Sequence, residues 1–455
     1  MMDWTKLLTE KRLGYPDAPT NEFRSSFQRD YDRIVFCPAF RRLQDKTQVF
    51  PLSSSDYVRT RLTHSIEVSC VARNLGTIIG RRLRKQGLLP DGIRSSDLGN
   101  IVAAASLAHD MGNPPFGHSG EAAIQNWFAK SETANRVKEH LMPQQILELA
   151  NYEGNAHAFR LVTRLLSSNH VGGLQLTFAT LGSLVKYPIG AHAASKEMKG
   201  KISAKKFNFF ETERSHFTEV AVETGLLRKP GRVEWWCRHP LAFVSEAADD
   251  IAYRIVDLED GYHMNCISYE ITANALKRLI TDARRKTNAD RIVHEKEKIA
   301  YLRSIAITQL VEEAAEKFFE KYDAILCGQY EKSLLYRIPS ENALKTIREL
   351  TLRYIYTDQR VLSVEVAGFE IIYQLMERFA CAAIDKLECR NSEKKLCVQS
   401  EKVLGLLPVQ YQRYGDRPLT KYYDLLLCVA DFVAGMTDSY AVDLFQKISG
   451  QKFVT

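Results

Sequence analysis

An adjacent histidine and aspartate, His109 and Asp110, stand where a strongly apolar stretch of the chain ends. The stretch, residues 101–108, is continuous enough to be a buried helix, and Gly112 with the two prolines that follow predicts where that helix stops. An imidazole nitrogen and a carboxylate oxygen at a rigid helix end suit a divalent cation such as Mn²⁺, Fe²⁺, Ni²⁺ or Zn²⁺, with Mg²⁺ tolerated. The pair therefore predicts part of a metal site.

His64 and Asp249 are the candidates for further ligands, because a metal needs more than two. Arg61 and His64 are three residues apart and share a helix face, which would place a phosphate-binding guanidinium beside a metal ligand. Asp249, Tyr253 and Asp257 follow at intervals of four and form a polar stripe that could line one wall of a pocket. Taken singly, each feature has a structural alternative: a lone histidine is commonly a satisfied core residue, and an acidic pair on a helix commonly faces solvent or complements the helix dipole.

Long helices are the elements predicted to position these residues. Apolar residues recur with a period of 3.6, whereas runs that alternate over four to eight residues are hard to find. The clearest helical windows are 66–83, 271–280 and 369–383. We therefore expect an all-α fold with few or no strands.

The composition is that of an ordinary globular protein. The 455 residues are 45% hydrophobic and 26% charged, which excludes a disordered or collagen-like chain. The net charge, 62 − 55 = +7, is compatible with an anionic ligand but is too modest for this length to indicate nucleic-acid binding. Nine scattered cysteines without a CxxC pair are interpreted as reduced and structural. Because the chain shows neither a leader peptide nor a run of about 18 apolar residues, we expect a cytoplasmic protein with no membrane contact.

The chain shows no internal repeat and no linker rich in Pro, Gly or Ser, so we expect one interwoven helical unit over 1–455. The strongest change in composition along the chain is at 193–210, where the apolar periodicity is weak and lysines are frequent. We expect a surface loop there. The lysines are Lys196, Lys199, Lys201, Lys205 and Lys206.

Taken together, these residues resemble a known family. The order His64, His109-Asp110, Asp249 is similar to the H…HD…D signature of HD-domain phosphohydrolases. Longer strings narrow the resemblance to the bacterial deoxyguanosinetriphosphate triphosphohydrolases: FRRLQDKTQV at 40–49, HDMGNPPFGHSGE at 109–121, YEGNA at 152–156, VKYP at 185–188, EAADDIAYRIVDLED at 246–260 and GMTD at 435–438. An HD pair alone is a weak signal, but this ordered set covers nearly the whole chain and is specific.

The resemblance implies an HD-type catalytic core over approximately 40–265, with 266–455 as a helical part that contributes to the pocket and to oligomer contacts. It implies metal-dependent hydrolysis of a deoxynucleoside triphosphate, dGTP before others, at the α-phosphate, which releases the nucleoside and inorganic triphosphate. The expected ion is Mg²⁺ or Mn²⁺, with Fe²⁺ or Ni²⁺ as alternatives. The implied metal ligands are His64, His109, Asp110 and Asp249. Asp249 is preferred to Asp250 because only Asp249 is in phase with Tyr253 and Asp257.

The resemblance assigns the catalytic roles to His118 and Glu121. An imidazole titrates near neutral pH and could protonate the leaving 5′-oxygen, with Glu121 to orient and charge it. As a base, His118 would instead act on the attacking water, and the sequence leaves both roles open. The structural alternative is a cap interaction in the turn at 117–120.

The triphosphate would need several fixed cations, and Arg61 and Lys186 match the family's phosphate contacts. Tyr187 and Asn113 are hydrogen-bonding neighbours, and Lys206 is a plausible addition. For the two lysines, simple surface solvation is the alternative.

Three residues match the sugar pocket of the family. Gln48 and Asp257 correspond to positions that bind the 3′-hydroxyl, and Tyr253 would form a wall against a 2′-hydroxyl. The structural alternative for Tyr253 is a core aromatic residue on a helix.

Base preference and partners stay open at this stage. The family includes guanine-selective enzymes and broad-specificity enzymes that a nucleotide activates, and its members form tetramers or hexamers, so we expect a homo-oligomer. Five residues could contact a base or an oligomer partner: Tyr330, Arg337, Tyr411, Tyr414 and Arg417. Two other hypotheses are another HD-type phosphohydrolase, such as a nucleotidase, and a protein that binds single-stranded nucleic acid through the lysines of 196–206.

Overall fold

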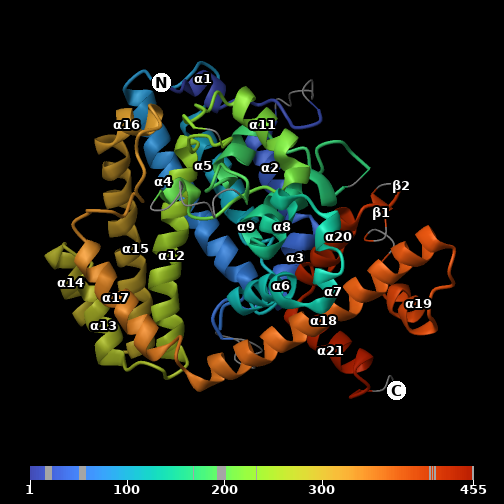
Figure 1. Cartoon of the computed structure of the whole chain (residues 1–455). Helices are drawn as coiled ribbons and strands as arrows, with labels where there is room; N and C mark the ends of the chain where they lie inside the picture. The colour runs from blue at the N-terminus through green and yellow to red at the C-terminus, as the bar shows by residue number, and fades with distance from the viewer. Residues whose placement is uncertain are drawn as a thin grey trace.

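The computed structural model is almost entirely helical, which confirms the predicted fold class (Figure 1). It describes residues 1–15, 23–50, 58–167, 169–191, 201–231, 233–408, 411, 413–414 and 417–452. Within that part of the chain the named strands are β1 (Arg413–Tyr414) and β2 (Arg417–Pro418), which pair antiparallel.

Helices α1 to α11 come from the first half of the chain. Their bounds are α1 Trp4–Leu7, α2 Ser26–Val35, α3 Pro38–Arg42, α4 Arg61–Lys85, α5 Ser95–Ala108, α6 His118–Lys130, α7 Glu132–Asn135, α8 Pro143–Ala150, α9 Gly154–Arg160, α10 Phe178–Leu184 and α11 Arg214–Glu223.

Helices α12 to α21 complete the molecule. Their bounds are α12 Pro240–His263, α13 Tyr269–Lys277, α14 Ala283–Asp290, α15 Glu295–Glu320, α16 Tyr322–Leu326, α17 Glu341–Tyr354, α18 Gln359–Ser392, α19 Val398–Gly405, α20 Tyr422–Ala434 and α21 Asp438–Ile448. All three periodic windows of the sequence lie on helices, namely α4, α13 and α18, although the window at 271–280 runs three residues past the end of α13.

Helices α4, α5 and α12 pack against one another and form the centre of the larger hydrophobic core. α4 and α5 approach closely because glycines face the contact: a Cβ at Gly76 would lie 2.6 Å from Val102 Cγ2, and one at Gly99 would lie 2.4 Å from Thr77 Oγ1. From Leu98 on, nearly every residue of α5 is buried. His109, which directly follows the helix, is therefore buried as well.

A second hydrophobic core joins α6 and α8 to the C-terminal helices α18, α20 and α21. Figure 1 shows α18 as one long helix that crosses the lower part of the molecule, from the end near α17 to the end near α19. The glycine at position 368 lets this helix approach the loop before α6, because a Cβ there would lie 2.4 Å from the Phe116 ring. The C-terminal part of the chain therefore packs on the loop that follows the His109-Asp110 pair.

The expected surface loop at 193–210 is only partly confirmed. Residues 193–200, with Lys196 and Lys199, lie outside the described residues. From 201 on the chain forms a loop in which Lys201 and Lys205 are exposed, but the surface position is confirmed only in part, because Ser203, Phe207 and Phe210 are buried. The lysines dominate the composition of the segment, whereas its phenylalanines decide where it packs, and Phe207 and Phe210 join the second core.

No single helix among the described residues is long and apolar enough to cross a membrane. α20 and α21 pass such a length and composition test only as a pair, and the chain bends by 113° between them.

Candidate metal centre and substrate pocket

Three side chains from three different helices meet in one cluster. His64 lies in the first turn of α4, His109 follows the last residue of α5, and Asp249 lies on α12. His64 Nε2 and His109 Nε2 are 3.3 and 3.4 Å from the same oxygen, Asp249 Oδ1, and the three potential ligand atoms all lie within 4.8 Å of one another. Metal–nitrogen and metal–oxygen bonds of about 2.0–2.2 Å would span these separations. The cluster is therefore a group that could hold a metal ion.

The orientation of His109 fits a metal ligand. Its Nδ1 lies 2.6 Å from the carbonyl oxygen of Ser106, one turn earlier on α5, so Nδ1 carries the proton and donates it. In the neutral ring Nε2 is then left with a lone pair facing Asp249. Burial alone would lower the pKa of His109, but the carboxylates of Asp110 and Asp249 raise it. The cluster therefore favours a positive charge at this point.

Asp110, the fourth predicted ligand, lies at the edge of the cluster. Its Oδ1 is 3.4 Å from His109 Nε2 and accepts a hydrogen bond from Asn113 Nδ2 at 2.6 Å, while its Oδ2 accepts one from Arg61 Nη1 at 2.7 Å. Burial would raise the pKa of this carboxyl, but His109 and Arg61 hold it well below its usual range. Asp110 is therefore ionised, and Arg61 and Asn113 fix its direction.

Lys186, predicted to contact phosphate, pairs with the metal-ligand candidate Asp249. Its Nζ is 2.6 Å from Asp249 Oδ2, and its side chain is only 12% exposed, which excludes the solvated alternative. Burial would raise the pKa of Asp249, but Lys186 and His109 lower it well below its usual range. Asp249 thus offers one oxygen to the histidines and the other to an ammonium group.

The loop between the HD pair and α6 has an unusual backbone. Phe116 and Gly117 both have positive φ, 60° and 58°, directly before His118, the first residue of α6. A Cβ at Gly117 would lie 2.8 Å from Arg61 Nη2 and would force the guanidinium to move, and the positive φ itself favours glycine. A non-glycine residue in this conformation is uncommon and is typical of functional sites.

The two predicted catalytic residues have separate partners. His118 is exposed, and the surrounding protein together with the positive charges of Arg61 and Lys206 lowers its pKa. Glu121 is buried and accepts a hydrogen bond from the Gly154 amide at 2.7 Å. Among the described residues no hydrogen bond joins His118 to Glu121, so the pairing of these two residues stays a prediction.

Lys206 lies close to Glu121 and to a second carboxylate, Glu153. Its Nζ is 2.8 Å from Glu153 and 3.6 Å from Glu121. Burial would lower the pKa of Lys206, but the two carboxylates raise it. The lysine is therefore a fixed positive charge between two acidic groups, and its alternative as a solvated surface residue does not apply.

The polar stripe on α12 ends in a hydrogen-bonded group that includes a residue the sequence did not indicate. The Tyr356 hydroxyl donates to Asp257 Oδ2 at 2.5 Å and is hydrogen-bonded to the Tyr253 hydroxyl, and the two rings stack 6.3 Å apart. Burial raises the pKa of Asp257 well above its usual range, although the hydrogen bond from Tyr356 lowers it. Tyr253 itself is 39% exposed, which excludes the alternative of a core aromatic.

Two buried acceptors in this region have no hydrogen-bond partner among the described residues. They are Gln48 Oε1 and Asp257 Oδ1. The segments that carry them both contact residues 355–356, because Val49 and Phe50 pack in one small cluster with Ile355 and partly buried Tyr356, and Tyr356 is hydrogen-bonded to Asp257. A buried acceptor without a partner is rare and calls for a ligand or a water.

The remaining predicted residues are placed as follows. Tyr187 is partly buried, its amide donates to Asn208 Oδ1 at 2.9 Å, and burial raises the pKa of its phenol. Of the base or partner candidates, Tyr330 donates to the Ser333 carbonyl and lies beside the Phe243 ring, and Tyr411 is buried against Phe432. The side chains of Tyr414 and Arg417 lie outside the described residues.

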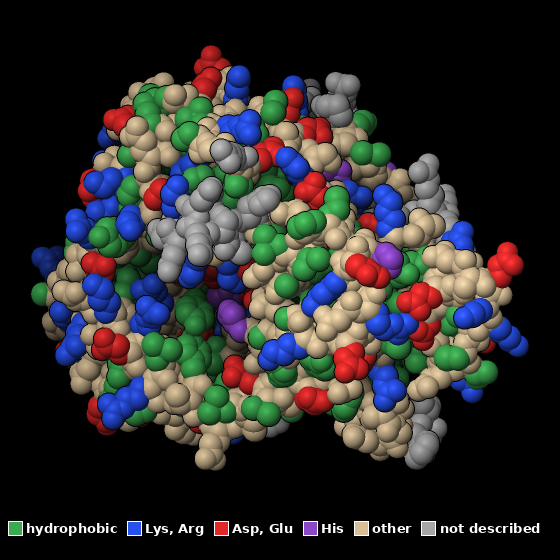
Figure 2. Space-filling model, in the orientation of Figure 1, with side chains coloured by type: hydrophobic (Ala, Val, Ile, Leu, Met, Phe, Trp, Pro, Cys, Tyr) green, Lys and Arg blue, Asp and Glu red, His purple; other side chains and the backbone are tan. Residues whose placement is uncertain are grey.

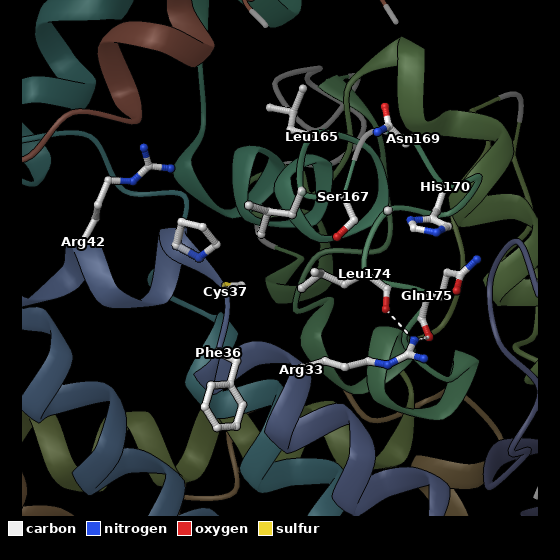
Figure 3. A pocket seen from close by; sticks show the side chains of 13 residues that line it. Arg33, Phe36, Cys37, Arg42, Leu165, Ser167, Asn169, His170, Leu174 and Gln175 are labelled. Atoms are coloured by element: carbon white, nitrogen blue, oxygen red, sulfur yellow. Dashed lines mark hydrogen bonds between the residues drawn. The ribbon is translucent and has the colours of Figure 1, made fainter.

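Figure 2 shows a hollow on the viewed face in which histidine and lysine or arginine side chains are visible. A separate cavity of about 820 Å³ opens between α2, α3 and the segment 165–175 (Figure 3). None of the residues that line it is a predicted site residue, and the Arg33 guanidinium donates to the carbonyls of Leu174 and Gln175 at 2.7 and 2.6 Å.

Sequence reasoning missed Tyr356 because it lies about 100 residues after its partners in a segment without a motif. It also missed Lys46 and Asp438, which contact the loop at 113–118, although both stand inside the motif strings 40–49 and 435–438. Their presence in those strings was the available signal.

Two family models match the chain, in agreement with this arrangement. The HD domain matches residues 61–173, and the phosphohydrolase-associated domain matches residues 339–447. The helical fold and the His64, His109 and Asp249 cluster thus define an HD-domain phosphohydrolase.

Full-length relatives narrow the class further. The deoxyguanosinetriphosphate triphosphohydrolase-like proteins of Synechocystis sp. and of Listeria monocytogenes are 41% and 36% identical, over 99% of this chain and 99% and 100% of theirs. The deoxyguanosinetriphosphate triphosphohydrolase of Cronobacter sakazakii is 30% identical over 94% of each chain. The chain belongs to the deoxyguanosinetriphosphate triphosphohydrolase family.

Proposed function

We propose that this protein hydrolyses deoxynucleoside triphosphates, dGTP before others, to the deoxynucleoside and inorganic triphosphate. The observation that carries the proposal is the stripe on α12. At one end Asp249 belongs to the cation cluster, and at the other Asp257 belongs to the hydroxyl-lined group with Tyr253 and Tyr356. One helix face of about 12 Å therefore joins a phosphate-activating site to a site for a sugar.

A divalent cation, Mg²⁺ or Mn²⁺ before Fe²⁺ or Ni²⁺, would be held by His64, His109, Asp110 and Asp249. When bound, it would polarise the α-phosphoryl group and lower the pKa of a water molecule. Arg61 and Lys186 already lie against Asp110 and Asp249, so each can turn a positive charge toward the triphosphate without entering from solvent. Their charges offset the repulsion between the substrate and the carboxylates.

His118 would transfer a proton at the reacting group. Its lowered pKa keeps the imidazole neutral at pH 7, ready to accept a proton from the attacking water. Donation to the leaving 5′-oxygen would follow once the ring is charged. Glu121, with the Lys206 ammonium group beside it, would orient and charge the His118 imidazole.

The sugar would bind by its 3′-hydroxyl to the unpartnered acceptors Gln48 Oε1 and Asp257 Oδ1. A hydroxyl that donates to either acceptor would satisfy a buried group that otherwise lacks a partner, which is a favourable term of about 1–3 kcal/mol. The Tyr253 ring would leave no room for a 2′-hydroxyl and so favour deoxynucleotides. Tyr356 would fix Tyr253 and Asp257 relative to each other.

The test is product analysis with each deoxynucleoside triphosphate, alone and in mixtures, in Mg²⁺ or Mn²⁺. We expect equal amounts of deoxynucleoside and inorganic triphosphate, and no product from the His109→Ala variant. Mixtures test whether a second nucleotide is needed for activity. Release of a nucleoside monophosphate and pyrophosphate would contradict the proposal and favour another HD-type reaction.

The homo-oligomer and the binding of single-stranded DNA, both predicted from the sequence, also stay proposals. Light scattering tests the first. The second predicts DNA binding that weakens steeply with salt and that His109→Ala leaves unchanged.

A further inference from the structure

The C-terminal segment reaches the candidate site through one buried carboxylate. Asp438, the first residue of α21, is 1% exposed. Its Oδ2 accepts hydrogen bonds from the Thr47 amide at 2.9 Å and from the Thr47 hydroxyl, and its Oδ1 accepts one from the Phe116 amide at 3.0 Å. One carboxylate thus joins two segments that lie about 70 residues apart in the chain and precede Gln48 and His118.

Lys46 makes a second connection between the same parts. Its Nζ is buried and donates to the carbonyl oxygens of Asn113 at 2.5 Å and of Ala434 at 2.8 Å. The Lys46 carbonyl in turn accepts from the Arg61 amide at 3.0 Å, at the start of α4. The segments at 46–47 and 113–116 are therefore joined by hydrogen bonds to the end of α20 and the start of α21.

The backbone at Phe116 explains why such a connection is needed. Phe116 and Gly117 hold positive φ angles, and for the non-glycine residue Phe116 this conformation is strained and persists only when its surroundings impose it. Asp438 accepts the Phe116 amide, and the closely packed Gly368 of α18 contacts the ring. Both restraints come from the C-terminal part of the chain.

We propose that Asp438 is a positioning residue, which through Thr47 and Phe116 sets the places of Gln48 and His118 relative to each other. This role rests on the proposed triphosphohydrolase activity, because Gln48 and His118 are its predicted sugar-binding and proton-transferring residues. Asp438 contacts neither of them directly, and it lies outside the cation cluster. Its loss should change catalysis without changing metal binding.

The test compares Asp438→Asn with Ser439→Ala. Asparagine keeps the shape of aspartate, but its amide nitrogen cannot accept an N–H, so the bond to either Thr47 or Phe116 is lost. Ser439 is the adjacent, exposed residue, and in the part of the chain that the structure describes its hydroxyl donates to Asp45. Thr47→Val removes the hydroxyl donor alone and serves as a second variant, and Thr47→Ser should restore it.

Amide hydrogen exchange and kinetics are the two readouts. We expect Asp438→Asn to speed exchange about tenfold or more at residue 47 or 116, whichever amide loses its acceptor, and to lower kcat at least tenfold, with Mn²⁺ affinity within about twofold of wild type. Thr47→Val should do the same more weakly, and Ser439→Ala should change nothing. Unchanged exchange at both amides, or faster exchange with unchanged kcat, would overturn the positioning role.

The exchange measurement needs no substrate, so it separates the positioning role of Asp438 from the proposed triphosphohydrolase activity. If wild-type protein hydrolyses no deoxynucleoside triphosphate, the proposed function fails whatever the exchange shows. If wild type is active and Asp438→Asn loses metal affinity together with kcat, Asp438 supports the fold of the cluster rather than the placement of Gln48 and His118, and the positioning role is refuted.

Discussion

Replacing Gly117 with alanine should damage both the fold and the site. Gly117 has φ 58° and ψ −125°, a combination that costs a residue with a Cβ about 1–3 kcal/mol. The added Cβ would also lie 2.8 Å from Arg61 Nη2, which must move. Arg61 is buried, and its displacement would strain the hydrogen bond to Asp110, worth roughly 1.5–3 kcal/mol. The expected destabilisation is thus about 2.5–6 kcal/mol.

Gly87→Ala is the matched control. Gly87 also has positive φ, 68°, but a Cβ there would meet nothing within 4 Å, so only a backbone cost of about 1–2 kcal/mol applies. Stability is measured by denaturant unfolding, and kcat/KM with dGTP. We expect Gly117→Ala to lower kcat/KM about 100-fold and Gly87→Ala to leave it near wild type.

A double-mutant cycle separates the contact with Arg61 from the backbone strain. In an Arg61→Ala background, Gly117→Ala should cost only the backbone share, so the two substitutions should be non-additive by more than about 1 kcal/mol. Equal unfolding midpoints and equal kcat/KM for Gly117→Ala and Gly87→Ala would refute the reasoning, as would strict additivity in the cycle.

Three further predictions concern the pocket and its surroundings. Tyr253→Ala should admit GTP as a substrate, with kcat/KM for GTP rising at least tenfold relative to dGTP, and a variant that still rejects GTP would place the gate elsewhere. Lys186→Met should raise the affinity for Mn²⁺, because it removes a cation 2.6 Å from Asp249, while raising KM for dGTP; weaker Mn²⁺ binding in titration calorimetry would contradict this. Burial lowers the pKa of Lys46 from 10.5 to about 7. The unfolded chain therefore binds more protons between these values, and stability should rise with pH across that window by an amount on the order of 5 kcal/mol. Lys46→Met should flatten this rise in unfolding experiments from pH 6 to 10, and an identical pH dependence in variant and wild type would refute it.

The sequence predicted the parts of the fold that depend on local spacing. Helical periodicity indicated an all-α chain, and the intervals between Asp249, Tyr253 and Asp257 placed them correctly on one helix face. The order of His64, His109 and Asp249 along the chain predicted that the three side chains meet. They form one cluster because the three helices that carry them pack against one another.

Features that depend on packing between distant segments could not be predicted from the sequence. The partner of Asp257 is a tyrosine 99 residues away, and the carboxylate that binds the Phe116 amide comes from 322 residues later. Spacing along one helix predicted that Glu121 serves His118, and it did not indicate that Glu121 also accepts a hydrogen bond from the Gly154 amide. The lysines at 201–206 suggested a loop in solvent, whereas neighbouring Phe207 is buried.

Mn²⁺ titration followed by electron paramagnetic resonance tests most directly the proposed binding of one divalent cation where α4, α5 and α12 meet. Wild-type protein should show one tight site per chain. His109→Ala and Asp249→Asn should weaken it roughly 100-fold or more. Asp250→Asn, the adjacent carboxylate outside the cluster, should leave it unchanged. Equal Mn²⁺ affinity in Asp249→Asn and wild type, or loss of the site in Asp250→Asn alone, would contradict the account.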